Sequence, residues 1–420
     1  MRVDPGSPGL PERLLRILVV APEFPPAIGG MEVHSEQIVR HLALRHDVVA
    51  LIPGPGEVRR VGGGTSEIRP VLSRRYGPSL WRAWRAAARQ RPDVVLAMNA
   101  GYAALGIWTA CPVVTRVVGN DFYRAWIGPH LPLRFLFWRL PTHGRISPGR
   151  WLRRADQRFR NWCVGRGLRR SAVILSNSNF TSGALSEARV EGPRVIRLLG
   201  GVDTAQFRPR DRGEARLRLA LGDAPVIVTV ARLARKKGID TVLEALPETL
   251  RRLPDLVYLI VGRGEEEDAL RSQAESLGVS RHVRFLGTRT HAELADILSA
   301  ADLYVHCSRT AIDPILGSRD VETMGRAVCE ANACGLPALV SQSGGLADVV
   351  IDGVTGQVIP EDDPAALAGA LVRMLSDDAL LQRMARQALE RARAEFSWEV
   401  VARRTEEALW LAIGSRGAPA

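Results

Sequence analysis

The sequence predicts an α/β protein with two similar domains, each a parallel β-sheet with helices on both faces, facing a cleft. Short apolar runs typical of buried parallel strands alternate with helical patterns along the chain. Strands joined by helices pair in parallel and place those helices on both faces of the sheet. The 420 residues suffice for two such domains, which we place at residues 1–205 and 206–398.

The first half begins with a strand over residues 16–21, followed by the turn Gly29-Gly30 and a helix through Ile38. A glycine turn ahead of a helix N-terminus makes a cradle for a phosphate or a sugar. Tight turns between strands and helices also need glycine for structural reasons, so both interpretations stay open. Further strands are predicted over residues 47–52, 93–97, 113–118 and 172–175, with a basic helix over 81–91.

The second half carries a basic turn after its first strand, residues 226–230. Arg232 and Lys237 lie in that turn, which ends at Gly238. The side chains of a basic turn are often simply solvated. Here, however, the chain also contains a pair of glutamates further along, and the combination of the cations with these carboxylates favours a binding site for an anionic ligand. Further strands are predicted over residues 256–261, 283–286, 303–305, 338–340 and 357–359, with a final helix over 399–413.

The paired glutamates are Glu322 and Glu330, eight residues apart with Gly325 between them. A helix is predicted over residues 326–334, because alanines favour it and Gly335-Leu336-Pro337 ends it. Eight residues turn a helix about 80° beyond two full turns, so the two carboxylates do not share one helix face. We therefore expect Glu322 on a loop and Glu330 inside the helix. A solvated acidic pair is the alternative.

The N-terminus of this helix is a candidate anion site. Free N–H groups around Gly325, Arg326 and Ala327 carry the positive end of the helix dipole, and the glycine permits close approach. In a helix, Glu330 lies about 6 Å along the axis from Arg326. That offset suits a carboxylate that accepts hydrogen bonds from a ribose.

The segment from Glu322 to Pro337 resembles the signature of glycosyltransferase family 4, whose members are retaining, nucleotide-sugar-dependent enzymes. The signature is a Glu, seven residues, a second Glu, a helix of small residues and a Cys-Gly-Xaa-Pro turn. In this chain the two glutamates are Glu322 and Glu330, and the turn is Cys334-Gly335-Leu336-Pro337. The resemblance extends over nearly the whole chain. It implies the GT-B fold, in which two Rossmann-like domains bind acceptor and donor and a C-terminal helix, here within 399–420, packs back on the first domain.

The resemblance also implies roles in the second domain. Arg232 and Lys237 match the family's pair that grips the donor diphosphate. Glu330 matches the carboxylate that binds the ribose, and Glu322 the one that holds the sugar hydroxyls.

On the acceptor side, Gly29 and Gly30 match the family's loop that lies against the diphosphate and the acceptor. Val118 stands where many members have a histidine, and Gly200 replaces the usual Asn in the link between domains. Asp121 follows a predicted strand, and ligands bind at the carboxyl ends of such strands. It is therefore a candidate for part of the histidine's role, with helix capping as the alternative.

The sequence thus predicts a retaining glycosyltransferase that moves a sugar from a UDP- or GDP-sugar to an acceptor hydroxyl. The acceptor is expected to be a glycan, a lipid-linked molecule or a small molecule. The expected role is in polysaccharide, glycolipid or natural-product synthesis. Its catalytic candidates are Glu322, Arg232, Lys237 and Asp121. Because fixed cations and a helix dipole meet the charge of the departing diphosphate, we expect neither a cofactor nor a metal. We expect the acceptor to attack from the face that the phosphate leaves.

Two other interpretations stay open. A nucleotide-sugar epimerase or a phosphorylase has the same architecture, and an epimerase turns over its nucleotide sugar without an acceptor. An arginine-rich nucleic-acid-binding protein binds with a steep salt dependence but leaves Glu322 and Glu330 unexplained. We expect no nucleic-acid partner.

Charge is distributed unevenly. Residues 1–205 carry 30 Arg against 14 Asp and Glu, a balance of +16, whereas the remainder carries 27 Lys and Arg against 31 Asp and Glu. The first half is therefore expected to face an anionic surface or substrate. Residues 131–170 hold eleven Arg interleaved with aromatic side chains, which suits an anionic membrane, a nucleic acid or a solvated helix with its aromatics in the core.

The cysteines and the N-terminus predict a location. Five cysteines have neither disulfide-framework nor metal-ligand spacing, which favours reduced thiols. The first apolar run is brief and interrupted by Arg16, unlike a signal peptide or a membrane span. We expect a cytoplasmic protein, with or without peripheral attachment to the inner face of the membrane.

Overall fold

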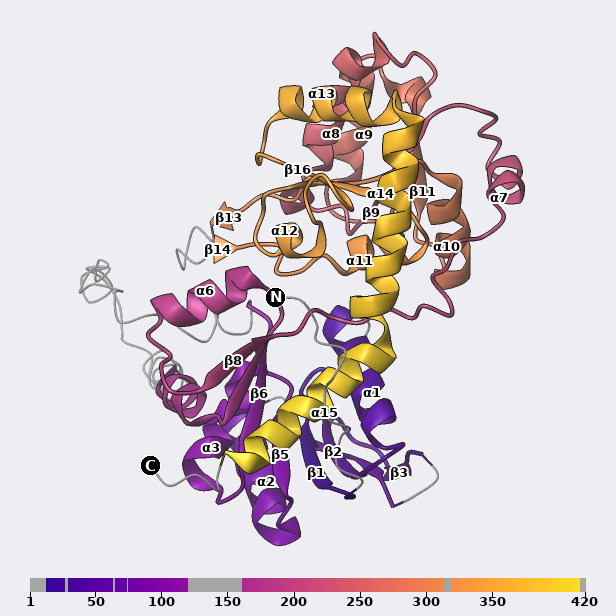
Figure 1. Cartoon of the computed structure of the whole chain (residues 1–420). Helices are drawn as coiled ribbons and strands as arrows, with labels where there is room; N and C mark the ends of the chain where they lie inside the picture. The colour runs from indigo at the N-terminus through magenta and orange to yellow at the C-terminus, as the bar shows by residue number, and fades with distance from the viewer. Residues whose placement is uncertain are drawn as a thin grey trace, which may run out of the picture. The chain divides into compact units, whose positions relative to one another are not determined.

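The chain forms two compact units (Figure 1). The computed structural model describes residues 13–26, 29–62, 65–73, 75–119, 161–312 and 319–415. Unit 1 comprises Met1–Ser176, Ala184–Leu198 and Ala402–Ala420, and unit 2 comprises Asn177–Gly183 and Leu199–Val401. The chain thus passes into unit 2 after Leu198, a few residues before the boundary placed from the sequence, and its last residues return to unit 1.

Unit 1 is built on an eight-stranded sheet in the order β3-β4-β2-β1-β5-β6-β7-β8. All neighbouring strands are parallel except β3 and β4. Its strands are β1 (Arg16–Val20), β2 (Asp47–Pro53), β3 (Arg59–Arg60), β4 (Glu67–Leu72), β5 (Val94–Ala97), β6 (Val113–Val117), β7 (Val173–Ser176) and β8 (Arg194–Arg197). The five predicted strands are confirmed. The others lie toward the two edges of the sheet, where burial on both faces is not required and the continuous apolar signal is absent.

In the described part of unit 1 the helical elements are α1 (Gly30–Leu42), α2 (Tyr76–Gln90), η1 (Ala100–Ala104), α3 (Leu105–Trp108), a helix over residues 161–170, part of α6 (Asn179–Glu187) and the end of α15 (Trp398–Gly414). On α15, Glu406 is buried and contacts the corner between α1 and β2. Its carboxylate lies 3.0 Å from His46 Nε2 and 3.2 Å from Arg45 Nη1.

Unit 2 is built on a six-stranded parallel sheet in the order β11-β10-β9-β12-β15-β16. Its strands are β9 (Val226–Val230), β10 (Val257–Val261), β11 (Val283–Gly287), β12 (Leu303–His306), β15 (Ala338–Ser341) and β16 (Gly356–Ile359), and a separate hairpin pairs β13 (Ala311–Ile312) with β14 (Arg319–Asp320). All six predicted sheet strands are confirmed.

Helices cover both faces of the second sheet, as the sequence predicts. One core packs α8 (Ile239–Leu250), α9 (Glu267–Ser276) and α13 (Pro364–Leu375) against the sheet, and the other packs α10 (His291–Ala300), α11 (Arg326–Ala333) and α12 (Leu346–Val349). The remaining elements are α7 (Arg212–Arg218), η3 (Arg235–Lys237), η4 (Ser280–His282), α14 (Asp378–Arg391) and η5 (Ala392–Phe396). Among the described helices, none combines the length and apolar character needed to cross a bilayer.

Among its parallel strands, each sheet reverses its strand order at one place. In unit 2 the order runs from β9 to β10 on one side and from β9 to β12 on the other. In unit 1 the corresponding pair is β1 and β5. The loops leaving such adjacent strands diverge to opposite faces and leave room for a ligand at the carboxyl ends. These two places are therefore where each unit is expected to bind a ligand.

Candidate functional site

The loop that leaves β9 is held by close backbone packing. Ala231 N donates to Val261 O at 3.0 Å, and Leu233 N donates to Arg263 O at 3.0 Å. A Cβ atom on Gly262 would lie 1.8 Å from Ala231 O, so only glycine fits there. The loop after β10 thus supports the basic turn and fixes its path.

The end of the basic turn is packed against the loop after β12. Gly238 has φ 63°, and a Cβ atom there would lie 1.7 Å from Cys307 O. Arg309 N donates to Lys236 O at 2.9 Å, which joins the two loops. The neighbouring strands β9 and β12 therefore present their following residues side by side.

Lys237 and Glu322 form an ion pair at this end of the sheet. Their side chains are only 16% and 19% exposed, so the pair is largely removed from water. His306, the last residue of β12, places Nε2 3.7 Å from Glu322 Oε2. Next to this cluster, Lys236 pairs with Asp320 at 2.9 Å.

The charge states in this cluster follow from burial and neighbours. Burial raises the pKa of Glu322, but the adjacent His306 ring and the Lys237 ammonium outweigh it and bring the pKa well below its ordinary value. Burial lowers the pKa of His306, which favours the neutral imidazole. Its ring nitrogens lie 2.8 Å from Ser308 Oγ and 3.2 Å from the Tyr304 hydroxyl oxygen. The cluster thus presents a carboxylate, an ammonium and a neutral ring.

The backbone carbonyl of Glu322 is fixed by the loop after β15. Gly345 N donates to it at 2.7 Å. Gly344 has φ 52°, and a Cβ atom there would lie 2.2 Å from the same carbonyl oxygen. Glu322 therefore lies on a loop, as predicted, but on one with a defined conformation.

Glu330 lies inside α11, also as predicted. Gly325 precedes this helix with φ 85°, and a Cβ atom there would lie 2.5 Å from Leu346 Cδ2. Arg326 Nε donates to Glu330 Oε1 at 3.0 Å. Burial raises the pKa of Glu330, and Arg326 opposes that rise only in part. The Arg326 side chain thus pairs with Glu330, in addition to the backbone role expected from the sequence.

Arg232 lies on the same loop as Lys237 but stands apart from the ion pair. Its side chain is 64% exposed, and its guanidinium lies 4.0 Å from Glu265, itself 60% exposed. A pair this exposed holds its partners weakly. The Arg232 side chain is accordingly available to a ligand in solvent.

The remaining candidates belong to unit 1. Gly29 precedes α1 in an extended conformation at φ 177°, and a Cβ atom there would lie 2.2 Å from Glu32 Oε2. The Glu32 side chain therefore lies beside the start of α1. Gly30 is the first residue of α1, after β1, which gives the strand, glycine turn and helix that the sequence predicts. Asp121 and most of the basic stretch 131–170 lie outside the described residues.

Two family models match the chain. The model for glycosyl transferases group 1 matches residues 211–391, and the model for glycosyltransferase family 4 matches residues 28–206. A GDP-mannose-dependent α-(1-6)-phosphatidylinositol monomannoside mannosyltransferase from Mycolicibacterium smegmatis is 30% identical over 372 residues, 86% of this chain and 89% of that protein. The chain belongs to the group 1 glycosyltransferases.

Other similarities agree with this membership. A glycogen synthase of Mycobacterium tuberculosis is 29% identical, with 94% of each chain covered. Sucrose-phosphate synthase from Thermosynechococcus elongatus superimposes with a TM-score of 0.71 at 20% identity, covering 95% of this chain and 99% of that one. Anabaena HepE, solved with UDP, gives 0.70 at 18% identity, covering 94% and 100%. These structures show that the glycosyltransferase has the predicted GT-B fold.

His306 and Ser308 lie at this cluster of the glycosyltransferase but are not among the site residues predicted from the sequence. The strand predicted from the sequence ends at Val305, whereas β12 includes His306. The available signal was a histidine at the carboxyl end of a buried strand, where α/β sheets bind ligands. Nothing in the sequence indicated that this strand lies beside β9 rather than at an edge of the sheet.

Proposed function

We propose that this glycosyltransferase binds a nucleotide-diphosphate sugar on unit 2, at the carboxyl ends of β9 and β12, and transfers the sugar with retention of configuration. The observation that carries the proposal is the contact between Lys237 and Glu322. In such a donor the phosphate is bonded to the anomeric carbon of the sugar, so the phosphate and the sugar hydroxyls lie close to each other. A cation and a carboxylate in contact therefore match the two neighbouring parts of the donor.

In this proposal the charge of the leaving diphosphate is met by three groups, of which Lys237 and the start of α11 are fixed. Lys237 contacts the phosphate nearest the sugar, Arg232 approaches from its exposed position, and the N–H groups of residues 325–327 at the start of α11 add their dipole. Groups fixed before the reaction need no reorganisation as charge develops on the leaving oxygen. They also supply the charge that a divalent metal would contribute, so we propose transfer without one.

Glu330 and Glu322 orient the donor in this proposal. Glu330 accepts hydrogen bonds from the ribose, and its pairing with Arg326 keeps the carboxylate in one rotamer. Glu322 accepts from the sugar hydroxyls, and its depressed pKa keeps it ionised. The acceptor hydroxyl attacks from the face that the phosphate leaves, and the departing phosphate oxygen takes its proton.

The relatives indicate which substrates to test first. The mycobacterial enzyme that covers most of this chain is named for GDP-mannose and a phosphatidylinositol monomannoside. We therefore propose a GDP-sugar as the first donor and a glycolipid as the first acceptor. A UDP-sugar comes second as donor, because HepE was solved with UDP, and a glycan comes second as acceptor, as the name of the glycogen synthase relative suggests.

The test is product analysis with purified protein, GDP-mannose or UDP-glucose, and lipid or glycan acceptors. The proposal predicts acceptor-dependent release of nucleoside diphosphate, undiminished by EDTA, and an α-linked product from an α-linked donor by NMR. A β-linked product would overturn retention, and loss of activity in EDTA would overturn metal independence. Conversion of the nucleotide sugar without acceptor would indicate an epimerase.

A further inference from the structure

Helix α2 of unit 1 presents tryptophans and arginines to solvent. Trp81 and Trp84 are 52% and 38% exposed, and the helix sequence contains three Arg but no Asp or Glu. Residues three and four apart lie on one helix face, so Trp81, Trp84 and Arg85 lie together. The Arg85 guanidinium lies 5.1 Å from the Trp81 ring centroid. Large aromatics left in water among cations indicate a surface that meets a partner.

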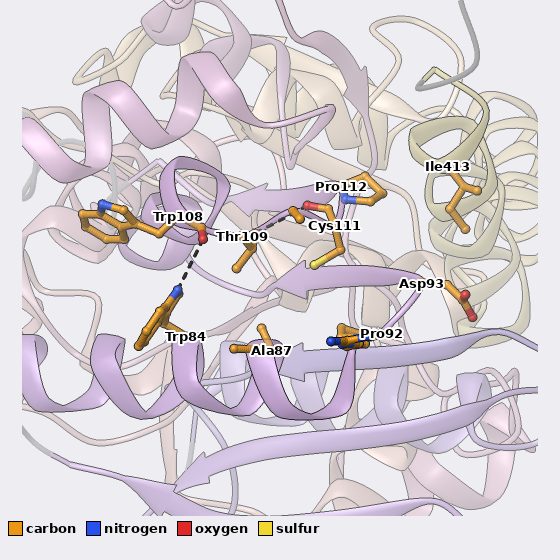
Figure 2. A pocket seen from close by; sticks show the side chains of 12 residues that line it. Trp84, Ala87, Pro92, Asp93, Trp108, Thr109, Cys111, Pro112 and Ile413 are labelled. Carbon is orange, nitrogen blue, oxygen red and sulfur yellow. Dashed lines mark hydrogen bonds between the residues drawn. The ribbon is translucent and has the colours of Figure 1, made fainter.

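A cavity of about 660 Å³ lies beside α2, between this helix and the segment from α3 to β6 (Figure 2). Its lining is largely apolar and includes Ala87, Pro92, Pro112 and Ile413 along with two tryptophans, Trp84 and Trp108. Trp84 Nε1 donates to Trp108 O at 3.3 Å, and Figure 2 shows these two side chains together at one end of the cavity. The volume and lining are those of a site for an apolar ligand.

The charges in the lining favour an anion at the mouth of the cavity. Asp93 is already engaged, since it accepts from Arg16 N at 2.8 Å and pairs with Arg13 at 3.3 Å. Arg91, which follows α2, has an exposed side chain with no ion pair to any residue in the described part of the chain. A cation beside an apolar cavity suits an amphiphile with an anionic head.

The cavity is distinct from the ligand-binding end of the sheet. It lies where β5 and β6 begin, whereas the Gly29-Gly30 turn lies after the carboxyl end of β1. The strands β1, β5 and β6 are parallel. The amino ends of β5 and β6 therefore lie on the opposite side of the sheet, along the strand direction, from the carboxyl end of β1. An occupant of the cavity would therefore attach the protein without taking part in the transfer.

We propose that the α2 face and this cavity dock on an anionic phospholipid membrane, with one lipid chain in the cavity. Tryptophan concentrates at the headgroup level of bilayers. Arginines near the surface are attracted to anionic lipids, and no carboxylate on α2 opposes them. A nucleic acid would use the arginines but not a largely apolar cavity. The proposal rests on unit 1 alone and is independent of the donor and acceptor.

The first test is flotation with vesicles of phosphatidylcholine, with and without phosphatidylglycerol. The wild-type protein is expected to float only with the anionic vesicles, and Trp81→Ala/Trp84→Ala should weaken binding at least 10-fold. Trp162→Ala is the matched control, because Trp162 is 53% exposed with Arg166 5.9 Å from its ring. The proposal is overturned if wild type fails to float, if the double variant floats normally, or if Trp162→Ala alone abolishes binding.

A charge variant guards against misfolding of the tryptophan variant. Arg85→Gln/Arg89→Gln changes two exposed side chains and should weaken binding several-fold. Arg251→Gln/Arg252→Gln removes the same charge from two exposed positions in unit 2 and should have no effect. Equal effects of the two charge variants would show that net charge alone drives binding and would overturn the proposal.

Cys111 gives a direct probe of the cavity in the unmodified protein. It lines the cavity and is half-buried, whereas the other four cysteines are buried. N-ethylmaleimide should therefore react first at Cys111, as peptide mapping can verify. Anionic vesicles should slow that reaction at least 5-fold and phosphatidylcholine vesicles should not. An unchanged rate in protein that has floated with the vesicles would overturn the placement of a lipid chain in the cavity.

Discussion

Lys237 and Glu322 form an ion pair although they lie 85 positions apart in the chain. Lys237 reaches the pair from the turn after β9, and Glu322 from the loop before α11. Both side chains are largely buried, so each depends on the other for its charge to be tolerated. Removing either partner therefore has consequences for stability as well as for the proposed chemistry.

Glu322→Gln should separate catalysis from nucleotide binding. We expect kcat to fall by about 10²–10³-fold, because an interaction with the reacting sugar is lost. Binding of the nucleoside diphosphate alone should change less than about 3-fold, because Glu322 is proposed to contact only the sugar. Steady-state kinetics and calorimetric titration measure the two quantities. A parallel loss of both would contradict the assignment of Glu322 to the sugar.

Glu322 and Glu330 should affect acid stability in opposite directions. The folded-state pKa of Glu322 is lowered, so its contribution is present above its ordinary pKa of 4.5 and is lost as the pH falls. The folded-state pKa of Glu330 is raised, so its contribution is present below 4.5 and is lost as the pH rises through the folded-state value.

Urea unfolding of the two glutamine variants across this range measures that difference. Relative to Glu330→Gln, the wild type should lose unfolding free energy as the pH rises from 4.5. Relative to Glu322→Gln, it should gain unfolding free energy as the pH rises toward 4.5. Glu330→Gln should also weaken nucleotide binding about 10-fold, for the loss of a charge-assisted hydrogen bond. The same sign of pH dependence for both variants would contradict the electrostatics described here.

Gly238→Ala should be much more destabilising than Gly222→Ala. Both glycines have a left-handed backbone, with φ 63° and 54°, which costs an alanine about 1–2 kcal/mol. A Cβ atom at Gly222 meets open space, whereas one at Gly238 meets the Cys307 carbonyl at 1.7 Å. We expect about 1–2 kcal/mol for Gly222→Ala and about 3–5 kcal/mol for Gly238→Ala, since overpacking adds its own cost. Equal losses in urea unfolding would show that the two loops are not packed together.

Much of this fold was predictable from the sequence. Strands such as β9 and β12, buried on both faces, carry continuous apolar runs. The edge strand β8 carries no such run, because its residues are exposed or only half-buried, and the sequence does not predict it. Helix α11 was predictable because its alanines and the Gly335 stop act locally.

The candidate site was predictable in part. The resemblance to the family points to Lys237 and Glu322 separately, but their contact depends on β9 and β12 being neighbours in the sheet. Strand order is a long-range property that no local pattern encodes. The environment of His306 was also not predictable from local patterns, because three separate loops make it. The cavity beside α2 was not predictable either, because it forms only when α2 packs against the sheet.

The most direct measurement is binding of GDP, UDP, ADP and dTDP to wild type, Lys237→Ala and Lys236→Ala, by thermal shift and calorimetric titration. Lys236 is the matched control, since it is the neighbouring lysine and pairs with Asp320 instead. A ligand at 100 times its Kd adds about 2.7 kcal/mol of stability, which a thermal shift detects. The account predicts that one nucleoside diphosphate stabilises wild type and Lys236→Ala, and that Lys237→Ala weakens its binding at least 10-fold with the fold intact. Unchanged binding in Lys237→Ala would contradict the proposed donor site.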